Sequence, residues 1–268
     1  MHLVSTVLLI LGLLSPSLSH ASEPTLTVST SPSPPLFFPE PFNEGMQGLE
    51  YDLVSALAKQ AGFKVEFKRY PWNRVIAFLE KGKLDLTMSM TRTPEREKFI
   101  HFLGFANYEQ FCILVSRKSD IKIEKLDDLT KPGFKFGLHQ NYHYSNEFNQ
   151  RLENDPEFRS HFEFLPDPIE EFDPLVSGKI QGFIFDGNIG AYALKTDKRM
   201  VELRMVCPPF FPPSPVNFAV SKQIPQEKID QLQKAYDSLK ADGTLNAILE
   251  RYIKIGYIPD PTKNEQNY

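Results

Sequence analysis

Between residues 25 and 91, short strand patterns alternate with helical patterns, and this order limits the fold more strongly than any other feature of the chain. The strand patterns, at residues 25–30, 64–68 and 84–90, alternate apolar and polar side chains as strands with one buried face do. The helical patterns, at residues 53–61 and 72–80, carry apolar side chains along one face, and each ends near a glycine. We therefore predict a mostly parallel sheet with helices on its faces.

A second series of the same kind follows from residue 110. A β-rich run covers residues 110–116, and further strand and helical patterns alternate up to residue 194. A proline-dense connection at residues 208–215 then leads to one more strand, at 216–220, and to two closing helical patterns. With 268 residues the chain is long enough for two lobes, and its halves look like two similar α/β units rather than tandem repeats of one motif.

The strand pattern at residues 84–90 leads into a helix start at Thr93 and Pro94, and Arg96 follows two residues later. Threonine is a good N-cap, and proline suits the first helical position. Free backbone N–H groups at a helix start attract anions, and a guanidinium binds a carboxylate through two parallel hydrogen bonds. The junction therefore suits a small carboxylate ligand, although an ordinary turn with its arginine in solvent fits the same residues.

The N-terminus has the pattern of a secretory signal peptide, which we place at residues 1–21. Residues 3–14 form an apolar run too short to span a bilayer as a helix, and residues 19–21 offer small side chains to a signal peptidase. The segment lacks Lys and Arg, which leaves an uncleaved anchor or a buried helix as alternatives. Because no cysteine lies near residue 21 and no later run is long and apolar, we expect neither a lipid anchor nor membrane insertion of the mature chain.

Several kinds of chemistry find little support in the sequence. The formal net charge of -4 gives no reason to expect nucleic acid or an anionic membrane surface as a partner. His139 and His143 could share a helix face as metal ligands, but no third ligand follows at a matching spacing, and such pairs are usually structural. The chain has no phosphate-binding glycine-rich loop and no Gly-x-Ser-x-Gly nucleophile motif. We expect no metal and no cofactor.

The chain has two cysteines, Cys112 and Cys207. In an oxidising compartment they could form one disulfide, and two buried free thiols are the alternative. The sequence leaves both open, because it does not show whether their Cα atoms come within bonding range.

Five short segments carry a family resemblance: residues 48–53, 82–85, 93–96, 178–186 and 241–244. Any one of these segments is a weak signal, but five in this order over nearly the whole mature chain are specific. In their order and spacing they resemble the family 3 bacterial extracellular solute-binding proteins, the periplasmic amino-acid receptors of ABC importers.

The resemblance implies an α/β fold of the periplasmic binding protein-like type II class, with two lobes joined by two crossover strands and a ligand cleft between them. Lobe 1 should comprise residues 22–108 plus 215–268, and lobe 2 residues 109–214. The crossovers should fall near residues 108–110 and within 208–215.

The same resemblance assigns roles to three residues. Arg96 matches the arginine that holds the α-carboxylate of the ligand, Thr91 matches the residue beside it, and Asp186 matches the acid on lobe 2 that takes the α-ammonium group. An amino acid is a zwitterion, so opposite charges on opposite lobes would make closure depend on the ligand. Asp186 could equally be an N-cap for the helix that follows, and one residue can do both.

Four further residues are candidates for ligand contact. Trp72 occupies a position where family members often place an aromatic side chain, although a structural tryptophan at the helix start is the alternative. Tyr142 and His143 lie where the family has a small, glycine-containing turn, and they either contact ligand or fill space. Ser31 stands where receptors for cationic amino acids carry an acid, and a hydroxyl cannot balance a buried cation. We therefore expect a neutral or polar amino acid, or a similar carboxylate.

The function that these expectations favour is a non-catalytic, monomeric periplasmic receptor that delivers its ligand to an inner-membrane ABC permease. The first alternative is an enzyme on the same scaffold, because certain cyclohexadienyl dehydratases resemble these receptors and a cleft acid can transfer protons. A strongly raised pKa of Asp186 would favour the enzyme, and an ion-paired, charged Asp186 would favour the receptor. The second alternative is a binding module that serves a signalling system.

Overall fold

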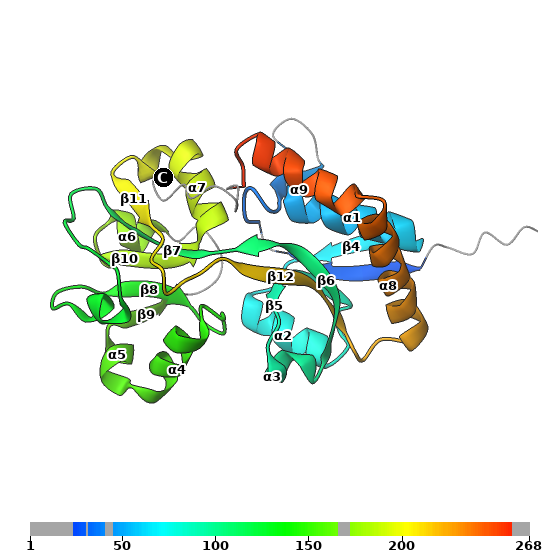
Figure 1. The fold of residues 1–268 in the computed structure, drawn as a ribbon, viewed down its shortest axis with the longest axis horizontal. Coiled ribbons are helices and arrows are strands. Elements are labelled where there is room, and N and C mark those ends of the chain that lie inside the picture. The colour runs from blue at the N-terminus through cyan, green and yellow to red at the C-terminus, as the bar shows by residue number, and fades with distance from the viewer. Residues whose placement is uncertain (1–23, 31, 41–44, 166–171, 259–268) are drawn as a thin grey trace, which may run out of the picture.

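The computed structural model describes residues 24–30, 32–40, 45–165 and 172–258, and Figure 1 shows a sheet in each half of the molecule. In spatial order, the first sheet contains β4 (Lys64–Lys68), β1 (Thr25–Ser29), β5 (Leu86–Thr91), β12 (Ser214–Ser221) and β6 (Ile100–Glu109). The second sheet contains β11 (Leu203–Val206), β7 (Phe111–Ser116), β10 (Gly182–Asp186), β8 (Phe136–His139) and β9 (Phe162–Leu165). A small separate sheet pairs β2 (Phe38–Pro39) with β3 (Met46–Gln47).

The helices divide between the same two halves. The first half contains α1 (Leu49–Ala61), α2 (Trp72–Glu80), α3 (Pro94–Glu97), α8 (Gln226–Ala241) and α9 (Thr244–Lys254). The second half contains the 3-10 helices η1 (Leu126–Thr130) and η3 (Lys198–Met200), and α4 (Asn146–Asn154), α5 (Pro156–Ser160), α6 (Asp173–Val176) and α7 (Gly187–Thr196).

In the first lobe, β1 pairs in parallel with β4 and β5, as the alternation of strands and helices predicts, whereas β12 runs antiparallel to β5 and β6. Figure 1 shows α1, α8 and α9 on one face of this sheet, with α2 and α3 on the other. Leu26, Leu53 and Leu232, from β1, α1 and α8, are completely buried in one core. Full burial of each leucine stabilises the fold by about 1.5–3 kcal/mol.

In the second lobe, β8 pairs in parallel with β9 and β10, and β7 runs antiparallel to β10 and β11. Aromatic rings fill much of its core. Phe148 on α4 lies 5.6 Å from Phe158 on α5 and 5.3 Å from Phe162 on β9, measured between ring centroids. Such edge-to-face pairs hold the two short helices against the sheet.

The two lobes are joined where β6 gives way to β7. The chain leaves the first sheet at Glu109, enters the second at Phe111, and returns through β12, whose first residue, Ser214, pairs with Glu109. The predicted type II class, with two α/β lobes and two crossovers, is confirmed. The lobe boundaries at residues 108 and 214 stay predictions.

The structure resolves the alternatives for the cysteines. Cys112, in β7, and Cys207, just after β11, form a disulfide with a Cα–Cα distance of 4.3 Å. The bond joins the first strand that enters the second lobe to the segment that leaves it. It therefore lies beside both crossovers, and the sulfur of Cys112 also packs close to Gly187 at the start of α7.

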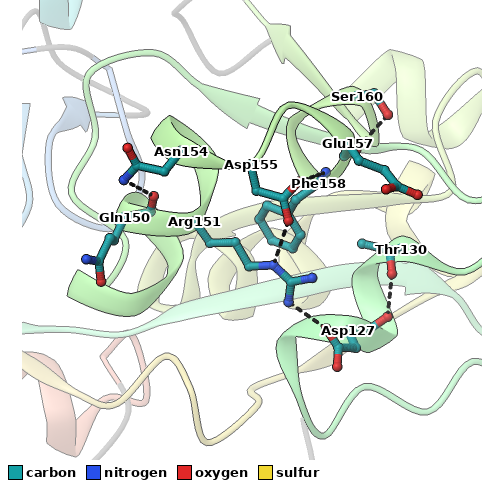
Figure 2. Close-up of polar contacts among 9 residues, drawn as sticks. All are labelled: Asp127, Thr130, Gln150, Arg151, Asn154, Asp155, Glu157, Phe158 and Ser160. Atoms are coloured by element: carbon teal, nitrogen blue, oxygen red, sulfur yellow. Dashed lines mark hydrogen bonds and ion pairs between the residues drawn. The ribbon is translucent and has the colours of Figure 1, made fainter.

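The charged run at residues 151–159 forms α4, α5 and the corner between them, as shown in Figure 2. Most of its charged side chains are exposed, but Arg151 has a structural role. Its Nη1 lies 2.6 Å from Oδ1 of Asp127 in η1, its Nε donates to Asp155, and its guanidinium lies 4.4 Å from the ring of Phe158. These contacts connect η1 to the α4–α5 corner.

The predicted signal peptide, residues 1–21, lies outside the described residues. Among the described helices, none combines the length and the apolar character needed to cross a bilayer.

Candidate functional site

A cavity of about 120 Å³ lies between the lobes. Residues of β1, β5, α1, α2 and α3 line it from the first lobe, and residues at the ends of β8 and β10 line it from the second. A buried water needs about 10–15 Å³ of such space, so the cavity has room for several waters or one small molecule.

Arg96 enters the cavity from the strand-to-helix junction that the sequence predicts. β5 ends at Thr91, the side chain of Thr93 accepts a hydrogen bond from the backbone N–H of Arg96, and Pro94 is the first residue of α3. The guanidinium donates from Nη1 to the backbone oxygen of Thr91 at 2.9 Å. Burial lowers the pKa of Arg96, and nearby carboxylates oppose this effect. The group lines the cleft instead of lying free in solvent, and its role in binding a carboxylate stays a prediction.

Arg96 and Trp72 also reach across the cleft. Nη2 of Arg96 and Nε1 of Trp72 both donate to the backbone oxygen of Asn141 in the second lobe, at 3.3 and 3.1 Å. The ring of Trp72 meets that of Tyr142 edge-to-face at 5.8 Å. Asn141 has φ 62°, a left-handed conformation that asparagine tolerates better than most residues. The turn that replaces the family's glycine-containing turn thus places a carbonyl oxygen opposite two donors of the first lobe.

Asp186 lies at the end of β10, where it is the N-cap of α7. Its Oδ1 accepts a hydrogen bond from the backbone N–H of Asn188 at 2.6 Å, and it also lines the cavity. Burial raises the pKa of Asp186 to about 6, against the hydrogen bonds from Asn188 and Ile189, which lower it. Within the described residues, Asp186 forms no ion pair. The predicted N-cap role is confirmed, and the position in the cleft permits a ligand role as well.

The sequence analysis missed two further acids, Glu50 and Glu109, that line the same cavity. Glu50, on α1, accepts a hydrogen bond from the hydroxyl of Ser89, and burial raises the pKa of Glu50 to about 7. Ser89 has φ 52° at an irregularity in the pairing of β5 with β12. This local distortion of the strand turns a polar residue toward α1.

Glu109 is the last residue of β6, beside the crossover. Its pKa is raised well above the ordinary value for a carboxyl group, first by burial, then by the negative charge of Asp186, while Arg96 opposes the rise. The signal in the sequence was an acid at the end of an otherwise apolar strand, inside one of the predicted crossovers. The sequence alone gave no reason to place it opposite Asp186.

The site holds more acidic side chains than arginines or lysines among its described lining residues. Glu50, Glu109 and Asp186 line the cavity, whereas Arg96 is the one arginine or lysine among its described lining residues. Like charges at short range raise one another's pKa, because each disfavours ionisation of the next. A cationic group placed among these acids would favour their charged forms.

The predicted site residues that the structure describes all come together in this cavity. They are Arg96, Asp186, Thr91, Trp72, Tyr142 and His143. Burial and the charge of Arg96 lower the pKa of His143. Ser31 lies outside the described residues. The contacts of these residues with a ligand stay predictions.

His139 and His143 do not share a helix face, because His139 ends β8 and His143 lies in the non-helical segment that follows it. His139, at the end of β8, donates its backbone N–H to the hydroxyl of Tyr144 and stacks among aromatic rings, 5.1 Å from Tyr142. Within the described part of the chain, no group of three His, Cys, Asp or Glu side chains is arranged to hold a metal ion.

Comparison with known sequences places this architecture among binding proteins. The bacterial extracellular solute-binding proteins, family 3, match residues 26–255. A probable histidine-binding protein of Neisseria gonorrhoeae is 26% identical over 208 residues, which cover 77% of this chain and 75% of that protein.

Two solved structures have the same fold. An ancestral arginine-binding protein bound to arginine superposes with a TM-score of 0.70 at 28% identity, covering 85% of this chain and 97% of that one. An ancestral amino acid-binding protein described as a precursor of cyclohexadienyl dehydratase superposes with a TM-score of 0.68 at 29% identity, covering 85% and 95%.

Proposed function

Because the chain belongs to the family 3 bacterial extracellular solute-binding proteins, we propose that it is a periplasmic receptor that captures a basic amino acid and delivers it to an ABC importer. The observation that carries the choice of ligand is the set of three carboxyl groups facing one guanidinium in the cleft. A signal peptide at residues 1–21, an inner-membrane permease as partner and a monomeric state belong to the same proposal.

The α-carboxylate and the α-ammonium group of an amino acid fit opposite sides of the site. Arg96 would hold the α-carboxylate, with the backbone and hydroxyl of Thr91 beside it, and Asp186 would take the α-ammonium group. Arg96 comes from the first lobe and Asp186 from the second, so a bound zwitterion would connect the lobes. A ligand that bridges both lobes favours the closed form by its differential affinity for that form.

The remaining acids favour a ligand with a second cation. The sequence analysis favoured a neutral amino acid because Ser31, a hydroxyl residue, stands where receptors for cationic amino acids carry an acid. That argument considered one residue, whereas the charge of the pocket is the sum over α1, β6 and β10, which contribute Glu50, Glu109 and Asp186. A neutral zwitterion offers one cation to these three acids, whereas a basic amino acid offers a second cation with which another carboxylate can pair once it ionises. Relatives described as histidine- and arginine-binding support this choice.

A calorimetric titration of the mature protein with the common amino acids tests the proposal. We expect arginine, lysine or histidine to bind more tightly than any neutral or acidic amino acid. Replacing Arg96 with Ala should abolish binding, because the carboxylate would lose its guanidinium partner. Arg92→Ala is a matched control, since Arg92 lies four residues earlier, is exposed, and pairs with Glu97 instead of facing the cleft. Binding that survives in Arg96→Ala, or a preference for neutral ligands, contradicts the proposal.

One observation favours a second candidate function, an enzyme that transfers protons. The raised pKa of Asp186, at about 6, and its lack of an ion pair within the described residues are what a general acid in a cleft would show. The likeness to a precursor of cyclohexadienyl dehydratase supports the same candidate. Turnover of a cyclohexadienyl carboxylate, followed by absorbance of the aromatic product and lost in Asp186→Asn, would establish the enzyme. Tight amino-acid binding without turnover would establish the receptor.

A further inference from the structure

Glu109 lines the cleft at the point where the chain passes from the first lobe to the second. It is the last residue of β6, it pairs with Ser214 at the start of β12, and one residue separates it from β7. Its side chain lines the cavity. A charge at this point is therefore close to both lobes and to both crossovers.

Among the described residues, the groups that face Glu109 give its carboxyl group neither a hydrogen bond nor an ion pair. Asp186 from β10 and Glu50 from α1 are acids, and Arg96 from α3 acts on it through charge. The other titratable side chains of the cavity are Tyr70, His139, Tyr142 and His143. Within the described residues, no donor hydrogen-bonds to the carboxyl group of Glu109 and no cation forms an ion pair with it.

The other two acids of the cavity differ in this respect. Asp186 accepts hydrogen bonds from backbone N–H groups at the start of α7, and Glu50 accepts one from the hydroxyl of Ser89. A carboxylate withdrawn from water without donors is costly, and such groups normally stay protonated or meet a cation. Among the described residues, Glu109 is thus the cavity acid whose charged form has no hydrogen-bond donor.

We propose that Glu109 is the counter-ion for a second cationic group of the ligand and that it decides between basic and neutral amino acids. This inference rests on the proposed function, which it deepens by assigning the specificity to one side chain. Glu50, whose carboxyl group accepts a hydrogen bond from Ser89, then does not contact the cation.

Binding of a cationic ligand group changes the number of protons that Glu109 holds. In the empty cleft, burial and the negative charge of Asp186 favour the protonated form of Glu109. When the cationic group of the ligand enters, the O–H bond of the carboxyl group breaks, the proton passes to solvent, and the carboxylate pairs with the ligand cation. Binding of arginine or lysine, whose side chains are already cationic, should therefore release a proton from Glu109 to solvent, and binding of a neutral amino acid should leave this proton in place.

Calorimetric titration of the mature wild type and of Glu109→Gln tests the proposal. Arginine, lysine and histidine are compared with the neutral citrulline and glutamine, each in two buffers that differ in ionisation enthalpy. The wild type should prefer a basic ligand by roughly tenfold or more, as expected for one charge-assisted hydrogen bond, and should release protons on binding it. Glu109→Gln should lose this preference and release about one proton fewer.

Two further variants separate the possible outcomes. Glu157→Gln, at an exposed position on α5, should behave as the wild type, and thermal unfolding of Glu109→Gln should show a cooperative transition. A preference that persists in Glu109→Gln, or one that is lost in Glu50→Gln instead, overturns the inference and leaves the proposed function standing. If the wild type binds none of the three basic amino acids, the proposed function fails and the inference fails with it.

Discussion

Replacing Glu50 with Gln should change how the stability of the unliganded protein depends on pH. Burial raises the pKa of Glu50 from 4.5 to about 7, so the folded protein holds a proton that the unfolded chain has already released. The free energy of unfolding therefore falls as the pH rises from about 4.5 to about 7, and this contribution is fully present only below the lower value. Its full size is roughly 3 kcal/mol, because one pKa unit corresponds to 1.36 kcal/mol.

Glutamine has no proton to lose, and its amide oxygen can still accept the hydrogen bond from Ser89. Urea unfolding at about pH 5 and about pH 8, without ligand, measures the effect. The free energy of unfolding of Glu50→Gln, minus that of the wild type, should increase by about 2–3 kcal/mol from the lower to the higher pH. Glu157→Gln, on the surface of α5, should show no such increase. A constant difference between Glu50→Gln and wild type would refute the argument that Glu50 is protonated in the folded state.

Three other predictions follow from the described contacts. Replacing both Cys112 and Cys207 with Ser should lower the free energy of unfolding by about 2–4 kcal/mol, because the disulfide constrains a long loop of the unfolded chain. A reducing agent should likewise lower the denaturant midpoint of the wild type. Asn141→Val should weaken ligand binding by about tenfold, because a β-branched residue is strained at φ 62°. Asn141→Gly should bind ligand within about threefold of the wild type, and calorimetric titration of both variants measures the difference. Arg151→Ala should cost about 1 kcal/mol by urea unfolding, as its ion pairs are largely exposed, and should leave ligand affinity unchanged.

The sequence predicted the features that depend on local order. The strands and helices predicted between residues 25 and 91 correspond to β1, α1, β4, α2 and β5 of the structure. The junction at Thr93 and Pro94 is a capped helix start, because threonine and proline act on the backbone within one turn. Asp186 is an N-cap for the same local reason.

The features that the sequence did not predict depend on residues far apart in the chain. Glu50 lies in a helix start and Glu109 in a crossover, and neither position shows that both face Asp186 until the two lobes are placed together. The acids of the pocket come from several distant elements, whereas the prediction of a neutral ligand considered Ser31 alone. The disulfide was undecided for the same reason, since Cys112 and Cys207 are 95 residues apart.

The central claim is that one amino acid lies between the guanidinium of Arg96 and the carboxylate of Asp186, with a second cationic group near Glu109. A crystal structure of the protein grown with arginine measures this most directly. We predict the ligand carboxylate on Arg96, its α-ammonium group on Asp186, and its guanidinium within hydrogen-bonding distance of Glu109. Arginine bound outside the cleft, or bound with its carboxylate away from Arg96, would contradict the account.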